Sequence, residues 1–360
     1  MSGDIPQAVG VRCGWSRRAR RSAGIGLAVA LLVAGCAQQA PRPDGAPPAT
    51  APATAASDGP VLARDRNYAV VVAQPGDTLA SLAERWLGSA SHRSAIAEFN
   101  RIDEVRPGQA IAIALEGRNN VGVRPGAAQA VTILCYHRFG PRANTLTVTP
   151  AAFEAQMGWL ARNGYTVIPF SRLDAFLEGR EPLPPKSVVI TIDDGYRATH
   201  EVAFPILRKY GFPATLFLYT DFVGAPDALT WAQMREMIAS GTFAVQPHSK
   251  SHSNLAVRQA DENEARYRER VRREIDVPVQ AIRRELGTRT QVFAFPYGDV
   301  NDVVVAELRS RGIEMGVTVT PGGNAFYAPP LMLRRTMIFG GDDLEAFRGK
   351  LVSAVPFGRP

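Results

Sequence analysis

Two adjacent aspartates at the end of an apolar run stand out in this 360-residue sequence. Residues 188–200 read VVITIDDGYRATH, so Asp193 and Asp194 end a predicted strand and precede a glycine. Neighbouring carboxylates repel each other and are costly to bury, so a fold that buries them must compensate their charge. The pair therefore marks a candidate functional site at the end of this strand.

Three of the five histidines stand at or just beyond the ends of other predicted strands. His137 ends the first strand in ILCYHRF, and His248 ends another in FAVQPHSKSH. His252 follows four residues later, a spacing that aims two imidazoles at one point on a helical turn or tight loop. Two histidines at this spacing, with no other evidence, are more often solvent-exposed polar residues than metal ligands. Beside a carboxylate, such a pair suits a borderline divalent cation such as zinc, with room for a water.

These residue types indicate metal-assisted hydrolysis. A bound metal lowers the pKa of its water and polarises a carbonyl. One aspartate can hold the metal while the other accepts the proton of the water. A backbone N–H in the Pro-Tyr-Gly turn of FPYG, residues 295–298, can donate to the developing oxyanion. A protonated histidine can return a proton to the leaving amine.

The elements that must position these residues alternate between strands and helices from Val131 onward. Between the apolar runs lie amphipathic stretches such as FEAQMGWLARNG, in which Phe153, Met157 and Leu160 share one helical face. This alternation predicts an α/β fold with a parallel sheet covered on both faces. Seven or eight units predict a (β/α) barrel, complete or incomplete, with the polar residues at the carboxyl ends of its strands.

Three motifs in this order resemble the signatures of polysaccharide deacetylases with the NodB-homology fold, carbohydrate esterase family 4. They are TIDDG (191–195), HSKSH (248–252) and FAFPYG (293–298), and the resemblance covers about residues 131–340. It implies an incomplete, seven-stranded (β/α) barrel. It also implies hydrolysis of the N-acetyl groups of N-acetylglucosamine units in a glycan.

The same resemblance implies a role for each matching residue. Asp193 is the expected base, and Asp194, His248 and His252 are the expected ligands of a divalent metal, with Zn²⁺ as the first choice. Tyr297 is expected to give its backbone N–H to the oxyanion.

Two positions depart from the family's pattern. Many members carry an arginine in the FAFPYG motif that orients the base; here that position is Ala294, and Arg335 in LMLRRTMI is the candidate replacement. Many members also have a late histidine as general acid, but no histidine follows His252. The CYHRF opening resembles the branch that deacetylates poly-β-1,6-N-acetylglucosamine in biofilms, which implies His137 as the acid. The alternative is a structural histidine packed beneath the site.

The N-terminus is typical of an export signal. Residues 1–35 carry five arginines and one aspartate, and an apolar run too short to span a membrane follows them. VAGC, residues 33–36, resembles a bacterial lipoprotein box, which implies lipidation of Cys36; the alternative is an ordinary signal peptide with a chance cysteine. Ala37 is compatible with the periplasmic face of a Gram-negative outer membrane. The remaining charge of the chain is only +3, which gives no reason to expect nucleic-acid binding.

The rest of the chain divides by composition. Residues 36–66, rich in Ala and Pro, predict a flexible tether. Residues 67–115 predict a βααβ module with Asp77 as a helix N-cap. Its segments GDTL, LAERWLG, IAEFN and VRPGQAIAI resemble a LysM module, which implies binding to peptidoglycan or a related glycan; the alternative is a spacer that binds nothing. Residues 116–130 predict a linker before the catalytic domain, 131–355.

One cysteine remains outside the signal and the lipid site. Cys135 lies in the apolar run VTILCYH, so it is expected to be a small buried residue, and no disulfide is predicted. The favoured function is an envelope-anchored deacetylase of an N-acetylglucosamine polymer such as poly-β-1,6-N-acetylglucosamine. A peptidoglycan deacetylase is the alternative enzyme. A catalytically inactive glycan-binding lipoprotein is the third reading, although all four base and metal positions are filled.

Overall fold

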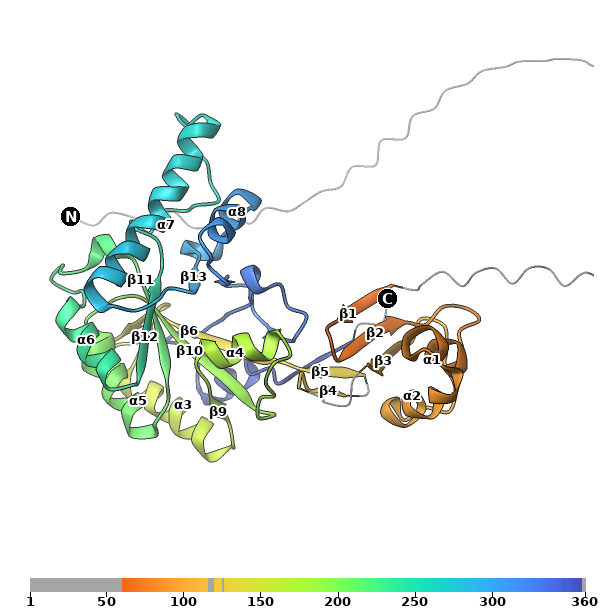
Figure 1. The fold of residues 1–360 in the computed structure, drawn as a ribbon. Helices are drawn as coiled ribbons and strands as arrows, with labels where there is room; N and C mark the ends of the chain where they lie inside the picture. Colours follow the sequence, from red (N-terminus) through yellow and green to blue (C-terminus); the bar gives the residue numbers. More distant parts are fainter. Residues whose placement is uncertain (1–59, 116–119, 125, 358–360) are drawn as a thin grey trace, which may run out of the picture. The chain divides into compact units, whose positions relative to one another are not determined.

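The computed structural model describes residues 60–115, 120–124 and 126–357 (Figure 1). The predicted signal peptide, Cys36 and residues 37–59 of the predicted tether lie outside these ranges. Within them, no helix combines the length and apolarity needed to cross a bilayer.

A mainly parallel sheet forms the centre of the α/β part (Figure 1). Its four longest strands are parallel and lie in the order β12-β11-β10-β6. Their bounds are Val131–Tyr136 (β6), Ser187–Asp194 (β10), Ala214–Leu218 (β11) and Phe243–Pro247 (β12). All eight residues of β10 are buried between β6 and β11, which explains the valines and isoleucines in its sequence. Shorter strands extend the sheet: β9 (Thr166–Val167), β15 (Gly323–Asn324) and β16 (Thr336–Met337).

The predicted α/β alternation is present, but a barrel is not confirmed. The described strands fall into separate sheets, with β13 (Val292–Ala294) and β14 (Met315–Val317) as a parallel pair of their own. Next to β12, the side chain of Gln246 takes the place of backbone ladder bonds. Its amide oxygen accepts from the backbone N–H groups of Gln291 and Val292, and its amide nitrogen donates to the carbonyl of Arg289.

Helices follow the strands, as the amphipathic stretches predict. They are α3 (Pro150–Arg162), α4 (Phe170–Leu177), α5 (Phe204–Tyr210), α6 (Trp231–Ala239), α7 (Glu264–Leu286), α8 (Asp302–Ser310) and α9 (Leu344–Gly349). In α3, Phe153, Met157 and Leu160 are fully buried and join residues of β10 and β11 in one core. Thr149 caps this helix by accepting the backbone N–H of Ala152.

The N-terminal module contains the predicted βααβ order and one further strand. Its helices are α1 (Leu79–Leu87) and α2 (Arg93–Asn100), and β2 (Tyr68–Val72) and β3 (Ala110–Ala114) are its predicted strands. The further strand, β1 (Val61–Arg64), pairs antiparallel with β2. It lies in the range predicted to be a tether. Asp65 makes the hairpin possible, because its carboxylate accepts the backbone N–H groups of the turn.

Two local expectations need correction. The N-cap of α1 is Thr78, which forms a capping box with Ser81; Asp77 instead pairs with Arg85. The predicted linker contains β4 (Val123–Arg124) and β5 (Ala127–Gln129), which form a three-stranded antiparallel sheet with β17 (Ala354–Pro356). Short strands of two or three residues give little periodic signal, so composition alone suggested a linker.

Candidate active site

The side chains of Asp193 and Asp194 point in different directions because the backbone φ becomes positive at Asp194. Both residues are paired with β11, Asp193 with Phe217 and Asp194 with Leu218. Asp194 has φ +76°, in the left-handed region that aspartate tolerates better than most residues. Gly195 follows with φ +94°, and a Cβ there would lie 2.6 Å from Leu218 Cδ1. The backbone conformation therefore favours glycine at position 195, and the left-handed conformation of Asp194 sends the two carboxylates to different neighbours.

Asp193 contacts a buried guanidinium. The carboxylate is 1% exposed, and Arg335 Nη1 donates to its Oδ1 at 2.7 Å. Arg335 is itself fully buried, and its Nε donates to the Thr318 carbonyl at 2.8 Å. Burial acts to raise the pKa of Asp193, but the neighbouring cationic group of Arg335 outweighs it and holds that pKa well below its usual value. Asp193 is thus ionised, as a base must be.

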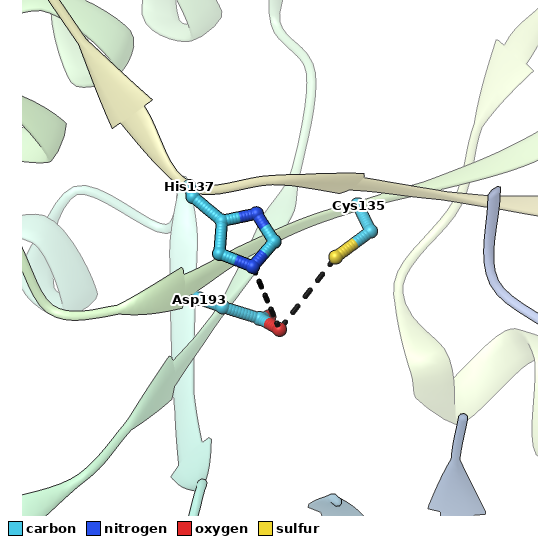
Figure 2. A group of neighbouring side chains, drawn as sticks. All are labelled: Cys135, His137 and Asp193. Carbon is cyan, nitrogen blue, oxygen red and sulfur yellow. Dashed lines mark hydrogen bonds and ion pairs between the residues drawn. The ribbon is translucent and has the colours of Figure 1, made fainter. Parts of the chain in front are cut away.

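The other oxygen of Asp193 faces two residues from the end of β6, shown in Figure 2. The Cys135 thiol donates to Oδ2 at 3.6 Å, and His137 Nε2 lies 4.0 Å from the same oxygen. Cys135 is buried, as expected from its apolar run, and burial raises the pKa of its thiol well above the usual value. It is therefore a protonated donor to the base, a contact that its apolar context did not indicate.

Asp194 forms a compact triangle with two histidines. Its Oδ1 lies 3.4 Å from His252 Nε2 and 3.8 Å from His248 Nε2, and the three ligand atoms lie within 4.8 Å of one another. That Oδ1 is buried without a hydrogen-bond partner, and burial raises the pKa of Asp194 to about 6. A buried oxygen that lacks a donor beside two imidazoles fits a ligand set for a divalent cation.

The histidines are prepared to act as ligands. His248 Nδ1 lies 2.8 Å from the Ala294 carbonyl oxygen. A carbonyl only accepts, so Nδ1 carries the proton and the Nε2 lone pair faces Asp194. Burial lowers the pKa of His248 to about 3 and also lowers the pKa of His252. Both rings are neutral at pH 7, so these residues fit a divalent cation such as Zn²⁺.

The loop after β12 is held by a carboxylate from α7. Glu274 accepts the backbone N–H groups of Lys250 (3.0 Å) and Ser251 (2.9 Å). Inside the loop, Ser249 Oγ accepts the backbone N–H of His252 at 2.9 Å. The sequence reasoning missed Glu274. Its signal was available: a charged residue on the buried stripe of α7, which includes Val271.

Tyr297 lies in the short helical turn Pro296–Gly298, with φ +62°. Its ring centroid is 4.9 Å from that of His252, which places this turn beside the metal triangle. The ring of Tyr219, which the sequence reasoning also missed, lies on His252 at 5.2 Å. Gly298 is required here because a Cβ would lie 2.6 Å from the backbone nitrogen of Val319.

Backbone strain concentrates in these motifs. Five non-glycine residues of the described ranges have positive φ, and four belong to the site: Asp194, Ser249, His252 and Tyr297. Each costs roughly 1–2 kcal/mol relative to a right-handed conformation, so the surrounding packing must impose them. The structure thus brings together every predicted site residue that it describes: His137, Asp193, Asp194, His248, His252, Tyr297 and Arg335.

Comparison with known proteins identifies this arrangement. Residues 180–316 match the family model described as polysaccharide deacetylase. The chain carries a polysaccharide deacetylase domain. This deacetylase domain is similar to a putative polysaccharide deacetylase, YxkH, of Bacillus subtilis, with 29% identity over 60% of this chain and 74% of the relative.

A second relative is the poly-β-1,6-N-acetyl-D-glucosamine N-deacetylase of Escherichia coli K12, with 27% identity over 58% of this chain. The match spans only 36% of that longer protein. Among solved structures, the deacetylase domain resembles the Streptococcus pyogenes deacetylase PplD in complex with acetate. The TM-score is 0.56 at 25% identity, covering 62% of this chain and 98% of PplD. It also resembles the Bacillus cereus polysaccharide deacetylase BC0361, with a TM-score of 0.54 at 26% identity, covering 69% and 73% of the two chains.

Proposed function

We propose that this protein is a metal-dependent N-deacetylase of an N-acetylglucosamine polymer, with poly-β-1,6-N-acetylglucosamine as the favoured substrate. The observation that carries the proposal is the pairing of two sites across the Asp193–Asp194 peptide. One carboxylate is ionised against Arg335, and the other completes a ligand set with His248 and His252. The substrate choice is supported by the names of the relatives and by the CYHRF sequence of the first strand.

In this proposal, Asp194, His248 and His252 hold the divalent cation, which polarises the acetyl carbonyl and acidifies a water when it is bound. Asp193 takes a proton from the attacking water at Oδ2, since Oδ1 is occupied by Arg335. Ionisation of Asp193 is secured by that arginine at neutral pH.

Two further groups act on the substrate. The backbone N–H of Tyr297 donates to the oxyanion that forms as the acetyl carbon becomes tetrahedral. His137 gives a proton to the nitrogen that leaves as the C–N bond breaks. His137 lies on the Asp193 side of the site, so the proton taken from water and the proton given to the amine are handled by neighbouring groups.

The deciding experiment measures acetate release from β-1,6- and β-1,4-linked N-acetylglucosamine oligomers, with metal content determined on the same samples. We expect β-1,6 oligomers to be the better substrate and His248→Ala to lose metal and activity together. Activity that persists after verified loss of metal would contradict the metal-dependent mechanism. Preference for β-1,4 oligomers would instead favour a peptidoglycan deacetylase, which the LysM-like sequence motifs support. A protein that binds metal but releases no acetate would be the inactive glycan-binding lipoprotein.

We also propose that the protein is exported and lipid-anchored at Cys36, with residues 67–115 binding peptidoglycan or a related glycan. The support comes from the VAGC sequence and the LysM-like motifs. The test compares Cys36→Ser with the unmodified protein in fractionated cells. Loss of membrane association in the variant is expected. An unchanged membrane fraction would rule out the lipid anchor at this residue.

A further inference from the structure

A second group of metal-ligating atoms lies next to the metal triangle and includes Asp193. Cys135 Sγ, His137 Nε2 and Asp193 Oδ2 lie within 4.8 Å of one another, and Figure 2 shows the thiol and the imidazole turned toward the same carboxylate oxygen. We call these three residues the thiol cluster. They come from the ends of two neighbouring parallel strands, β6 and β10, so the fold itself holds them together.

The ligand atoms need only small movements to bind a cation. The Cys135–Asp193 separation is 3.6 Å and the His137–Asp193 separation is 4.0 Å. Tetrahedral zinc with bonds of 2.0–2.3 Å holds its ligand atoms about 3.3–3.5 Å apart. The Cys135–Asp193 separation is already close to that range, and the His137–Asp193 separation must shorten by about 0.5–0.7 Å. His137 Nδ1 is buried without a partner, so no hydrogen bond fixes the ring against such a movement.

The thiol makes this cluster chemically different from the triangle. Asp194, His248 and His252 offer oxygen and nitrogen, whereas the thiol cluster offers sulfur, nitrogen and oxygen. Thiolate ligands select zinc and softer ions such as cadmium. We propose that Cys135, His137 and Asp193 form a second, inhibitory site for thiophilic divalent cations. The thiol proton passes to solvent as the metal–sulfur bond forms.

Occupancy of this site would stop the proposed reaction. The metal would hold Asp193 Oδ2, the oxygen proposed to accept the proton of water, and His137, the proposed acid. The two sites are adjacent, because Asp193 Oδ2 of the thiol cluster lies 3.7 Å from His248 Nε2 of the metal triangle. Repulsion from the first cation and from Arg335 makes the second site the weaker one. The enzyme would then be active with one equivalent of metal and inhibited by an excess, a consequence that rests on the proposed function.

Binding is tested without any substrate. Full-length protein, with Cys13 and Cys36 replaced by serine so that Cys135 is the one thiol, is stripped of metal and titrated with Co²⁺ and Cd²⁺. Thiolate-to-metal charge-transfer absorption reports sulfur coordination, and equilibrium dialysis gives the stoichiometry. We expect two equivalents, with the charge-transfer band developing with the second. In Cys135→Ser and Cys135→Ala, the band should vanish and the second affinity should fall more than about 100-fold, since a ligand is lost outright.

His248→Ala is the matched control. It removes a ligand of the triangle, so the tight equivalent should be lost while the charge-transfer band remains. One equivalent with no charge-transfer band in the protein that retains Cys135 would overturn the proposal, whatever the outcome of the activity assays. In those assays, the rate at one equivalent of Zn²⁺ divided by the rate at ten equivalents should be at least tenfold smaller in Cys135→Ser than in the protein that retains Cys135. An unchanged ratio would overturn the inhibitory role.

Discussion

Asp193 and Asp194 are adjacent in the sequence, yet their surroundings have opposite electrical character. Asp193 faces a buried guanidinium, and its pKa is held below the usual value. Asp194 faces two neutral imidazoles, and burial raises its pKa to about 6. Arg335 donates directly to the first carboxylate, whereas the buried Oδ1 of the second has no hydrogen-bond donor. This difference explains how identical neighbours can take different roles.

The comparison predicts that amide substitutions of the two aspartates fail in different ways, and this is the largest expected effect. Asp193→Asn removes the base, so the rate of acetate release should fall by roughly 10²–10⁴-fold while metal binding is retained. Asp194→Asn should lose the metal. Both are measured by acetate release alongside metal analysis of the same preparation. If Asp193→Asn lost its metal as readily as Asp194→Asn, the division of roles would be wrong.

The ion pair between Asp193 and Arg335 can be removed by replacing the arginine. Arg335→Met leaves Asp193 buried without its partner, which should lower the free energy of unfolding by about 3–5 kcal/mol. Denaturant unfolding measures this. Because the folded pKa of Asp193 is lowered, the stability from the pair is present above the unfolded pKa of about 3.9 and is lost as the pH falls below it.

The control for this prediction is the double variant Arg335→Met with Asp193→Asn. Without a buried charge, it should recover part of the lost stability. A double variant no more stable than Arg335→Met would mean that packing, rather than the unpaired carboxylate, causes the loss.

Much of this site could be predicted from sequence because each residue stands at the end of an apolar run. Parallel strands bring such ends to one edge, so Asp193, Asp194 and His248 were predicted together. Arg335 was harder, since it follows a short helical turn, Pro330–Met332, rather than a long strand. It was proposed only because Ala294 left the base without its expected arginine, and the structure places it on Asp193.

The features that the sequence does not predict depend on where side chains point and on long-range contacts, rather than on residue type. Periodicity marks Cys135 as buried but does not show that its thiol turns toward Asp193. The separation of β13 and β14 from the main sheet depends on contacts between residues far apart, such as the Gln246 side chain that bonds to the backbone at Gln291. Neither feature has a local pattern.

The role of His137 is a smaller and separable prediction. His137→Ala removes the proposed acid while leaving all three residues of the metal triangle, so kcat should fall about 10²-fold with metal content unchanged. The measurement is the rate with an N-acetylated oligomer and with an acetyl ester. The alcohol that leaves from an ester needs less help from a general acid than the amine that leaves from an amide. The loss of rate in His137→Ala should therefore be smaller with the ester. Equal losses on both substrates would leave His137 a structural residue.

The smallest expected effect concerns the pH dependence of metal binding by Asp194, His248 and His252. Asp194 must be ionised to bind metal, and its pKa is raised to about 6 by burial, with a further contribution from the charge of Asp193. Metal affinity, measured by competition with a chelator between pH 5 and pH 8, should therefore fall about tenfold per unit below pH 6. In Asp193→Asn the repelling charge is absent, so the fall should begin at a lower pH. If metal affinity begins to fall at the same pH in Asp193→Asn, burial alone sets the pKa of Asp194. The charges of the two carboxylates would then be independent, although the residues are joined by a peptide bond.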